Sequence, residues 1–465
     1  MSGPFDLAFG VVALAVALLT AAHAVVYKRE PRSAALWVLL AWLLPIVGAI
    51  LYVFFGVNRV QRRAARLRRD LVRVRTTSES DERLPITELV PLARLVGAVV
   101  ERPLLAGNSI EPLVDGTEAY PAMLQAIDAA QRSVALASYI FHADGIGERF
   151  VEALIRAQRR GVAVRVLLDD VSCRISLHSP EKRLRRAGVA VGDFNPPLVP
   201  ARVNAFNLRN HRKILVVDGE LGFTGGMNID RHYWGANAYR DTHFRLRGPV
   251  VAHLMEVFAD DWLFTTDEPL RGGEWFPQIA PAGPSLARGI EAGPDESFER
   301  LRWTYLGALN AAQRTVRICT PYFLPDGGII SALDAAALRG VDVDIILPEE
   351  TDLPHIRWAM VHQLWQVLDR GCRVWMRPGP FDHSKLMVVD AHWTFLGSGN
   401  WDARSLRLNF EFNVESYCRQ FGRRMDELIV ERRAGARRVS LDDVNSRPPA
   451  IKLRDGVARL FAPLL

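Results

Sequence analysis

The chain has 465 residues, 49% of them hydrophobic, which is enough for more than one globular unit with its own core. The formal net charge is +6, but residues 56–75 alone hold eight arginines and one aspartate, which leaves residues 76–465 slightly acidic. A nuclease would carry its positive charge on the catalytic body, so nucleic acid is not expected as a partner.

Two apolar stretches open the chain. Residues 5–27 are interrupted only by Asp6 and His23, and residues 34–55 are wholly apolar. As a helix, each stretch is long enough to cross the roughly 30 Å hydrocarbon core of a bilayer. The first stretch lacks the basic start of a signal peptide, and the second follows six residues later. The pattern predicts a two-helix transmembrane hairpin over residues 1–58, with spans at about 5–27 and 34–55.

A basic juxtamembrane linker is predicted over residues 59–100. Its arginines, from Arg59 to Arg75, place the following body on the cytoplasmic side by the positive-inside bias. The turn between the two apolar stretches, which holds Lys28, Arg29 and Arg32, is also basic and would have to lie outside. The basic cluster suits contact with anionic lipid headgroups, and a solvated helix is the alternative interpretation.

The rest of the chain repeats itself at a spacing of about 180 residues, which indicates duplication of one unit. In each copy a helix ends at a glycine and a buried, β-branched strand follows, as residues 160–168 and 339–347 illustrate. Helices that alternate with short apolar strands predict an α/β fold. We therefore expect two similar α/β sandwich halves, residues 101–285 and 286–465, after the transmembrane hairpin.

One set of polar residues occurs once in each half, with identical spacing, and this is the strongest feature of the sequence. The first half has His211, Lys213, Asp218, Gly225, Gly226 and Asn228, and the second half has His383, Lys385, Asp390, Gly397, Ser398 and Asn400.

Strand periodicity places each histidine of this set beside its lysine, because alternate residues share a face. Each aspartate has the opposite parity and ends the strand, so we assign it to the turn and the local geometry. The glycine-containing loops predict phosphate contacts through Gly226, Ser398, Asn228 and Asn400.

This set suits phosphodiester chemistry without a metal or another cofactor. One imidazole attacks phosphorus, the other protonates the leaving alkoxide, and lysines and asparagines stabilise the developing charge. The four cysteines, Cys173, Cys319, Cys372 and Cys418, stand singly, which argues against a disulfide framework and a zinc site.

These residues resemble the HKD motifs of the phospholipase D superfamily, and the chain resembles the bacterial cardiolipin synthases within it. The resemblance includes residues 42–48, 139–141, 320–326 and 400–405. It implies that His211 and His383 form one active site, in which one becomes a phosphohistidine and the other acts as general acid and then as general base. It also implies that Asp241 and Glu411 orient the histidines.

The reaction implied by the resemblance transfers a phosphatidyl group between two phosphatidylglycerol molecules and gives cardiolipin and glycerol. The implied partners are membrane phospholipids, and the implied location is the bacterial inner membrane. A hydrolytic phospholipase D, a synthase that uses another alcohol such as ethanolamine, a membrane-tethered nuclease and a non-catalytic lipid-binding protein are the alternatives. The sequence does not indicate the oligomeric state. The last segment, residues 451–461, has two interpretations, a membrane-lying amphipathic helix and a helix packed on the body.

Overall fold

The computed structural model describes residues 4–28, 31–53, 87–170, 179–194, 209–294, 297 and 299–460. These residues fall into two units, one with the N-terminal helices and one with the described residues from 87 onward, which we call the body. Each unit is described by itself.

The N-terminal unit contains α1 (Pro4–Tyr27), α2 (Pro31–Leu43) and α3 (Pro45–Leu51). Among the described residues, Ala8–Tyr27 of α1 is the one helical segment that is long and apolar enough to cross a membrane. Inside this unit the ring of His23 and the hydroxyl of Tyr52 lie 2.8 Å apart, so two polar groups on separate helices are paired.

The second apolar stretch differs from the single helix predicted over residues 34–55. It breaks at Leu44, whose φ of −136° and ψ of 74° are not helical. The cause is Pro45, because a proline ring disfavours the helical conformation of the residue before it. A Cβ on Gly48 would lie 2.5 Å from the carbonyl oxygen of Leu40, so the backbones of α3 and α2 approach closely there. Residues 54–86, with the end of the predicted hairpin and most of the basic linker, lie outside the described residues.

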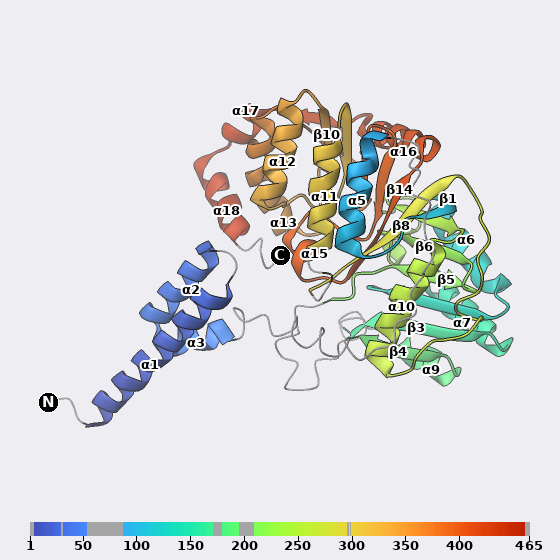
Figure 1. Cartoon of the computed structure of the whole chain (residues 1–465), viewed down its shortest axis with the longest axis horizontal. Helices are drawn as coiled ribbons and strands as arrows, with labels where there is room; N and C mark the ends of the chain where they lie inside the picture. Colours follow the sequence, from blue (N-terminus) through green and yellow to red (C-terminus); the bar gives the residue numbers. More distant parts are fainter. Residues whose placement is uncertain are drawn as a thin grey trace. The chain divides into compact units, whose positions relative to one another are not determined.

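Fifteen strands among the described residues form one sheet, in which the two halves of the body repeat the same order. From the middle outward, the first half runs β1-β7-β6-β5-β2-β3-β4, and the second half runs β8-β14-β13-β12-β9-β10-β11 with β15 at its edge. The prediction of a duplicated α/β unit is confirmed (Figure 1). The first-half strands are β1 (Leu105–Val114), β2 (Ser133–Ser138), β3 (Ala163–Asp169), β4 (Ala190–Phe194), β5 (Ile214–Val217), β6 (Leu221–Gly225) and β7 (Thr242–Arg247). The second-half strands are β8 (Ser285–Ala292), β9 (Thr315–Cys319), β10 (Asp342–Pro348), β11 (Arg373–Arg377), β12 (Leu386–Val389), β13 (Trp393–Gly397), β14 (Glu411–Tyr417) and β15 (Arg437–Val439).

The halves meet where β1 pairs antiparallel with β8, through Leu105 with Ala287 and Asn108 with Ser285. The outer strands of each half are parallel, as β2-β3-β4 and β9-β10-β11. Gly161 and Gly340 follow the ends of the helices before β3 and β10, and their φ values of +87° and +89° favour glycine.

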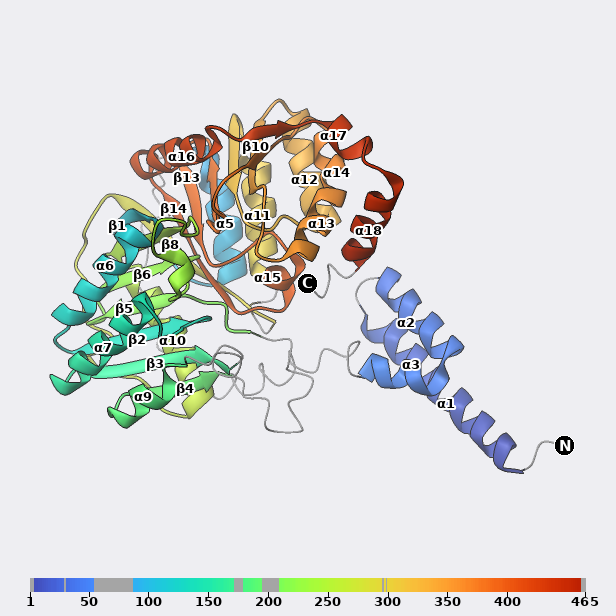
Figure 2. The same ribbon diagram turned by 180° about the vertical axis from the view of Figure 1, so that it is seen from behind.

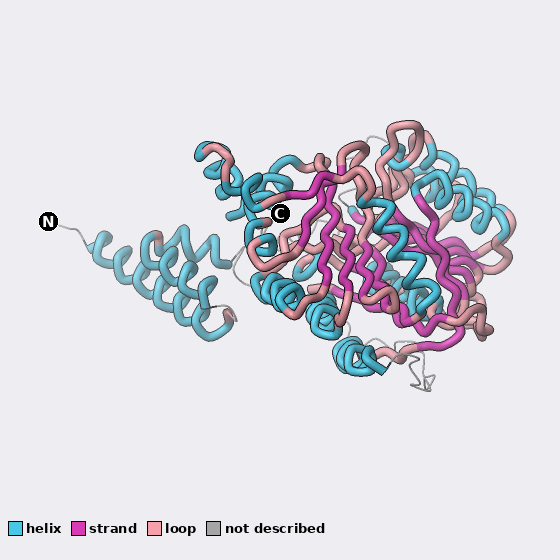
Figure 3. Tube along the Cα trace, turned by 90° about the horizontal axis from the view of Figure 1, so that it is seen from above, coloured by secondary structure: helices cyan, strands magenta, loops and turns pink. Residues whose placement is uncertain are grey.

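Helices cover both faces of the strands (Figure 3). In the first half, α6 and α7 lie on one face and α10 on the other (Figure 2). In the second half, α11 and α12 lie on one face and α16 on the other. The apolar cluster around α10 and α16 contains strand residues of both halves, so the halves share one continuous core. The helices of the body are η2 (Thr87–Leu89), α5 (Val90–Val100), α6 (Asp115–Ala129), α7 (Ile146–Arg159), α9 (Glu181–Arg186), η4 (Arg231–Tyr233), α10 (Val251–Thr266), α11 (Arg300–Ala311), α12 (Gly327–Leu338), α13 (Pro354–Gln363), α14 (Trp365–Leu368), α15 (Ala403–Arg407), α16 (Arg419–Arg433), α17 (Leu441–Asn445) and α18 (Pro449–Leu460).

The end of the predicted linker is a packed helix. Leu92, Val96 and Val100 of α5 recur every four residues and are buried in the core of the second half. The spacing of one turn puts them on one helix face, which packs against α11. Residues 90–100 therefore belong to the body, although they precede the first-half strands in the chain.

Candidate active site

The first motif histidine is held by the second half of the body. The backbone N–H of His211 donates to the carbonyl oxygen of Phe410 at 2.9 Å. The next residue along, Glu411, places its carboxylate oxygen Oε2 3.0 Å from Nδ1 of His211. The ammonium of Lys213 donates to the carbonyl oxygen of His211 at 2.8 Å. All three charged or titratable side chains are buried.

The second motif histidine is held by the first half in the same manner. The N–H of His383 donates to the carbonyl oxygen of Arg240 at 2.7 Å, and the next residue, Asp241, places Oδ2 3.0 Å from Nδ1 of His383. The ammonium of Lys385 donates to the carbonyl oxygen of His383 at 2.6 Å. The Tyr233 hydroxyl also lies 3.0 Å from Nδ1 of His383. Each histidine is thus paired with the carboxylate of the opposite half.

Hydroxyl and amide donors surround the carboxylate of Glu411. Ser398 donates to Oε2 at 2.5 Å, and Ser405 and Asn409 donate to Oε1 at 2.8 and 3.3 Å. The Ser398 hydroxyl, which was predicted to contact phosphate, thus donates to Glu411, and its contact with phosphate stays a prediction. The loop after β13 therefore supports the carboxylate that orients the histidine.

A glycine stands at the equivalent place in the first half. A Cβ on Gly226 would lie 2.7 Å from both carboxylate oxygens of Asp241 and 2.9 Å from the carbonyl oxygen of His383. Asp241 accepts a hydrogen bond from the N–H of Thr242 at 2.7 Å. The shorter carboxylate thus occupies the space that a side chain at position 226 would need.

The two motif asparagines are buried on the loops that follow β6 and β13. The side-chain oxygen of Asn228 accepts a hydrogen bond from the N–H of Ile140 at 3.3 Å. The N–H of Asn400 donates to the Ser405 hydroxyl at 3.0 Å, whereas Oδ1 of Asn400 has no partner within the described part of the chain. A buried amide with unmet hydrogen-bonding capacity suits a binding site.

The two motif aspartates hold strand ends together. The carboxylate of Asp218 accepts backbone N–H bonds from residues 131–133, and that of Asp390 accepts them from residues 313–315, the closest at 2.7 Å in each half. Their φ values are +54° and +53°, as expected at a tight turn. The geometry gives both aspartates a structural function at the starts of β2 and β9.

Sequence reasoning missed two arginines. Arg212, between the histidine and lysine of the first motif, donates from Nε to the carbonyl oxygen of Glu411 at 3.2 Å and pairs with Asp261 at 2.5 Å. Arg432 of α16 donates to the carbonyl oxygen of Asp241 at 3.3 Å. Each arginine therefore fixes the backbone of one orienting carboxylate. They occupy different positions in the two halves, so the repeat could not reveal them.

Tyrosine rings flank the histidines in both halves. The ring of Tyr139 meets that of His211 edge-on at 5.0 Å between centroids, and the Lys213 ammonium lies 5.3 Å from the Tyr139 centroid. Tyr322, the equivalent residue of the second half, meets the ring of His383 edge-on at 6.4 Å. The aromatic rings contribute to the burial of both histidines.

Burial makes both imidazoles weak bases. It lowers the pKa of His211 to about 4, against the opposing effect of the Glu411 carboxylate. It also lowers the pKa of His383 well below its ordinary value, with a further contribution from the charge of Lys385. Burial alone would raise the pKa of Glu411, but its interactions with His211 and Ser398 outweigh burial and lower it. Burial thus favours the neutral form of each imidazole, whereas the contacts of Glu411 favour its ionised form.

Burial also shifts the remaining charged groups. It lowers the pKa of Lys213 to about 7 and that of Lys385 to about 8, although nearby carboxylates oppose the shift. It raises the pKa of Asp241 to about 8, against the effect of the Lys385 charge. The two orienting carboxylates therefore differ, although they occupy equivalent places.

Neither metal nor disulfide chemistry has a framework in the described part of the chain. Among the described residues, no group of three histidine, cysteine, aspartate or glutamate side chains could hold a metal ion. Cys319, Cys372 and Cys418 are buried free thiols, and Cys173 lies outside the described residues. The absence of a cofactor stays a prediction.

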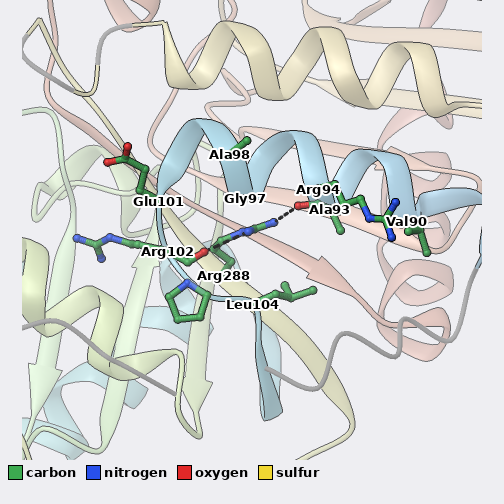
Figure 4. Close-up of a pocket in the computed structure, with 10 residues that line it drawn as sticks. Val90, Ala93, Arg94, Gly97, Ala98, Glu101, Arg102, Leu104 and Arg288 are labelled. Atoms are coloured by element: carbon green, nitrogen blue, oxygen red, sulfur yellow. Dashed lines mark hydrogen bonds between the residues drawn. The ribbon is translucent and has the colours of Figure 1, made fainter. Parts of the chain in front are cut away.

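A separate cavity of about 400 Å³ opens between α5, the start of β1 and β8 (Figure 4). Its main cation, Arg288, pairs with Glu415 at 2.6 Å and donates to the carbonyl oxygens of Ala93 and Arg102. None of the motif residues lines this cavity, and Arg288 is already paired. Arg288 therefore links β8 to α5, and we assign no catalytic role to this cavity.

Two protein-family models match the chain. The model described as cardiolipin synthase, PLD-like domain matches residues 123–262 and 305–431, once in each half. The model described as phospholipase D-nuclease N-terminal matches residues 12–56. Together they match the N-terminal unit and both halves of the body.

Curated relatives and a solved structure agree with these matches. A cardiolipin synthase of Geobacillus kaustophilus is 32% identical over 451 residues, which cover 94% of this chain and 90% of the relative. The major cardiolipin synthase of Bacillus subtilis is 29% identical over 459 residues, which cover 94% of this chain and 95% of the relative. The crystal structure of a phosphatidylserine synthase from Haemophilus influenzae superposes with a TM-score of 0.62 at 16% identity, covering 80% of this chain and all of the other, and it shows a common fold.

Proposed function

The chain belongs to the cardiolipin synthases of the phospholipase D superfamily, and from this premise we propose how its two halves perform phosphatidyl transfer. It is a phosphatidyltransferase that acts on membrane phospholipids. The proposed reaction takes the phosphatidyl group from one phosphatidylglycerol to a hydroxyl of a second, and it yields cardiolipin and glycerol.

The first step forms a covalent intermediate. One motif histidine attacks phosphorus with its Nε2 lone pair, because its Nδ1 faces a carboxylate. A phosphorus–nitrogen bond forms while the phosphorus–oxygen bond to glycerol breaks. The other histidine enters this step as an imidazolium, which the carboxylate on its Nδ1 and the anionic phosphate stabilise. It donates its Nε2 proton to the departing glycerol oxygen, so neutral glycerol leaves.

The second step reverses the proton transfer. The deprotonated histidine takes the proton from a terminal hydroxyl of the second phosphatidylglycerol, and that oxygen attacks phosphorus. The phosphorus–nitrogen bond breaks, and both histidines return to their starting states. Water competes with the lipid hydroxyl for the same intermediate, and its attack would give phosphatidic acid.

The observation that carries this proposal is the crossed pairing of histidines and carboxylates. His211 is oriented by Glu411, and His383 by Asp241, each across the junction of the halves. A carboxylate on Nδ1 fixes the ring and stabilises positive charge on it. Neither half contains both members of a pair, so neither half could function alone.

We propose that the lysines and asparagines of both motifs hold the phosphoryl oxygens. Lys213 and Lys385 are buried beside the histidines, and Asn228 and Asn400 lie on the loops that follow β6 and β13. Preorganised donors in a buried site stabilise developing negative charge more than they would in water. Gly226 contributes by leaving room for Asp241, and Ser398 by holding Glu411.

We further propose that the enzyme is a multi-pass protein of the bacterial inner membrane, with its body facing the cytoplasm. The helical segment Ala8–Tyr27 provides one crossing by length and composition. Helix α2 has 13 residues and spans only about 20 Å, so a second crossing would have to include residues beyond Leu43. The eight arginines of residues 56–75 favour the cytoplasmic side.

Lipid analysis of the full-length protein in detergent tests the proposed reaction, with phosphatidylglycerol as the only lipid. Equal amounts of cardiolipin and glycerol would establish the proposed transfer. Phosphatidic acid without cardiolipin would establish a hydrolase. If cardiolipin formed only after another lipid or alcohol was added, the proposed pair of substrates would be wrong. His211→Ala and His383→Ala should each nearly abolish product formation, whereas His355→Ala, outside the motifs, should retain it.

A further inference from the structure

The one buried side chain of the C-terminal helix α18 is an aspartate. Asp455 is 1% exposed and pairs with Arg447 at 2.5 Å and with Arg454 at 2.7 Å. The Arg454 guanidinium also lies 4.4 Å from the ring centroid of Trp358 on α13. These contacts fix the rotation of α18 against the body, where Figures 1 and 2 show it as an outer helix beside α17.

The opposite face of α18 is apolar and exposed. Leu453, Val457 and Leu460 are 70%, 46% and 78% exposed. At 3.6 residues per turn they fall within about 60° of one another, so they form one stripe. An ordinary surface helix buries such a stripe, whereas α18 leaves it exposed and buries Asp455 instead.

Basic side chains border the stripe. Lys452 and Arg454 lie on its two sides, and Arg459 lies on the Lys452 side, about two turns farther along the helix. Asp455 is the one acidic residue of the helix, and its ion pairs neutralise it on the buried face. An apolar stripe with a cationic border is complementary to acyl chains below anionic headgroups.

We propose that α18 binds the surface of a bilayer that contains anionic phospholipid, with Leu453, Val457 and Leu460 inserted at the level of the upper acyl chains. This inference rests on the proposed function only in that the substrates of the enzyme lie in that bilayer. It adds a second membrane contact, made by the catalytic body itself and distinct from the N-terminal helices. Such a contact would restrict the orientation of the body at the lipid surface.

A second copy of the chain is the alternative partner that could cover the apolar stripe. The cationic border disfavours it, because a symmetric contact would bring like charges together. The membrane therefore fits the charge and the apolar stripe together, and the second copy fits only the stripe.

Depth measurement in proteoliposomes tests the proposal without any need for turnover. A polarity-sensitive fluorophore is attached to the cysteine of the Val457→Cys variant, in full-length protein in which Cys173 is replaced by serine. The vesicles contain phosphatidylglycerol with either brominated or ordinary acyl chains. Leu338→Cys is the control, on an exposed apolar position of α12, with 70% exposure against 46% for Val457. We expect blue-shifted emission at position 457 with at least twofold quenching by brominated chains, and neither effect at position 338. Equal, water-like emission at both positions would overturn the proposal. A blue shift at position 457 that increases with the protein-to-lipid ratio, without quenching by brominated chains, would also overturn the proposal. It would indicate that a second copy of the chain covers the stripe.

A kinetic comparison provides the second test. The variant Leu453→Gln/Val457→Gln/Leu460→Gln changes only exposed side chains, so it should melt at the wild-type temperature. We expect wild-type turnover in mixed micelles and an apparent KM raised several-fold in vesicles, with Leu338→Gln unchanged in both. Equal kinetics of the triple variant and the wild type in vesicles would overturn the proposal, whereas failure of the proposed reaction would appear as missing cardiolipin in micelles.

Discussion

Replacing Glu411 by glutamine tests the crossed pairing most sharply. The substitution preserves the shape of a fully buried side chain and removes the charge 3.0 Å from Nδ1 of His211. A hydrogen bond to a charged group contributes roughly 1.5–3 kcal/mol, which corresponds to a loss of roughly 10- to 150-fold in kcat if the contact is strongest in the transition state. Glutamine also turns an N–H₂ toward the donors Ser405 and Asn409, so some loss of stability is expected as well.

The control is Glu415→Gln, four residues along the same strand. Glu415 is equally buried, but it pairs with Arg288 and Trp393 and contacts neither histidine. Cardiolipin formation per folded molecule, with the folded fraction taken from circular dichroism, should fall only for Glu411→Gln. Wild-type kcat for that variant, or equal losses for both, would refute the role of Glu411 in orienting the histidine.

Four further predictions follow from the site. Gly226→Ala should lower kcat at least tenfold, because its Cβ would lie 2.7 Å from the orienting carboxylate of the first half, whereas Gly327→Ala, with nothing within 4 Å, should be silent in the same assay. Asp390→Asn should lower the free energy of unfolding by about 1–3 kcal/mol in urea titration, because it weakens a buried group of backbone hydrogen bonds, and a wild-type midpoint would contradict its structural role. The value of kcat/KM should fall as pH rises through about 7 to 8, because Lys213 and Lys385 are cationic only below their pKa values, and a flat profile from pH 6 to 10 would contradict their binding of phosphate. Excess EDTA should leave turnover unchanged, and a loss that Mg²⁺ or Zn²⁺ restores would overturn the metal-free mechanism.

Local patterns were sufficient to predict the repeat and the motif strands. β5 begins at Ile214 and β12 at Leu386, directly after the motif lysines, because alternation and β-branched residues determine a buried strand within a few positions. The motif histidines and lysines precede these strands, so their predicted placement on the strands was wrong. The equal order of strands in the two halves follows from duplication of the sequence. The fold was therefore predictable wherever the evidence was local or repeated.

The contacts that assemble the site were not predictable in this way. His211 and Glu411 are 200 residues apart, and contacts such as the backbone bridge of Asn210 with Phe410 bring them together. The break before Pro45 was missed because hydropathy alone does not register the conformational effect of proline on the preceding residue. The hydrogen bond from Ser398 to Glu411 was missed because the sequence does not show that these residues lie side by side.

Repeat symmetry also has limits as a guide to function. Arg212 and Arg432 hold equivalent carbonyl groups from non-equivalent positions, one before β5 and one on α16. An alignment of the two halves compares only equivalent positions, so it does not detect two arginines that make the same contact from different positions. Tertiary contacts thus converge on the same geometry after the two sequences have diverged.

Trapping of the covalent intermediate tests the central claim most directly. Full-length enzyme mixed with phosphatidylglycerol labelled at phosphorus would be quenched in alkali within a turnover, and the labelled peptides would be mapped. The account predicts at most one phosphatidyl group per chain, on either His211 or His383. Removing the carboxylate that faces that histidine should slow the labelling by at least tenfold. Two labelled histidines in one chain would mean two independent sites, and that result would contradict a single site shared by the halves.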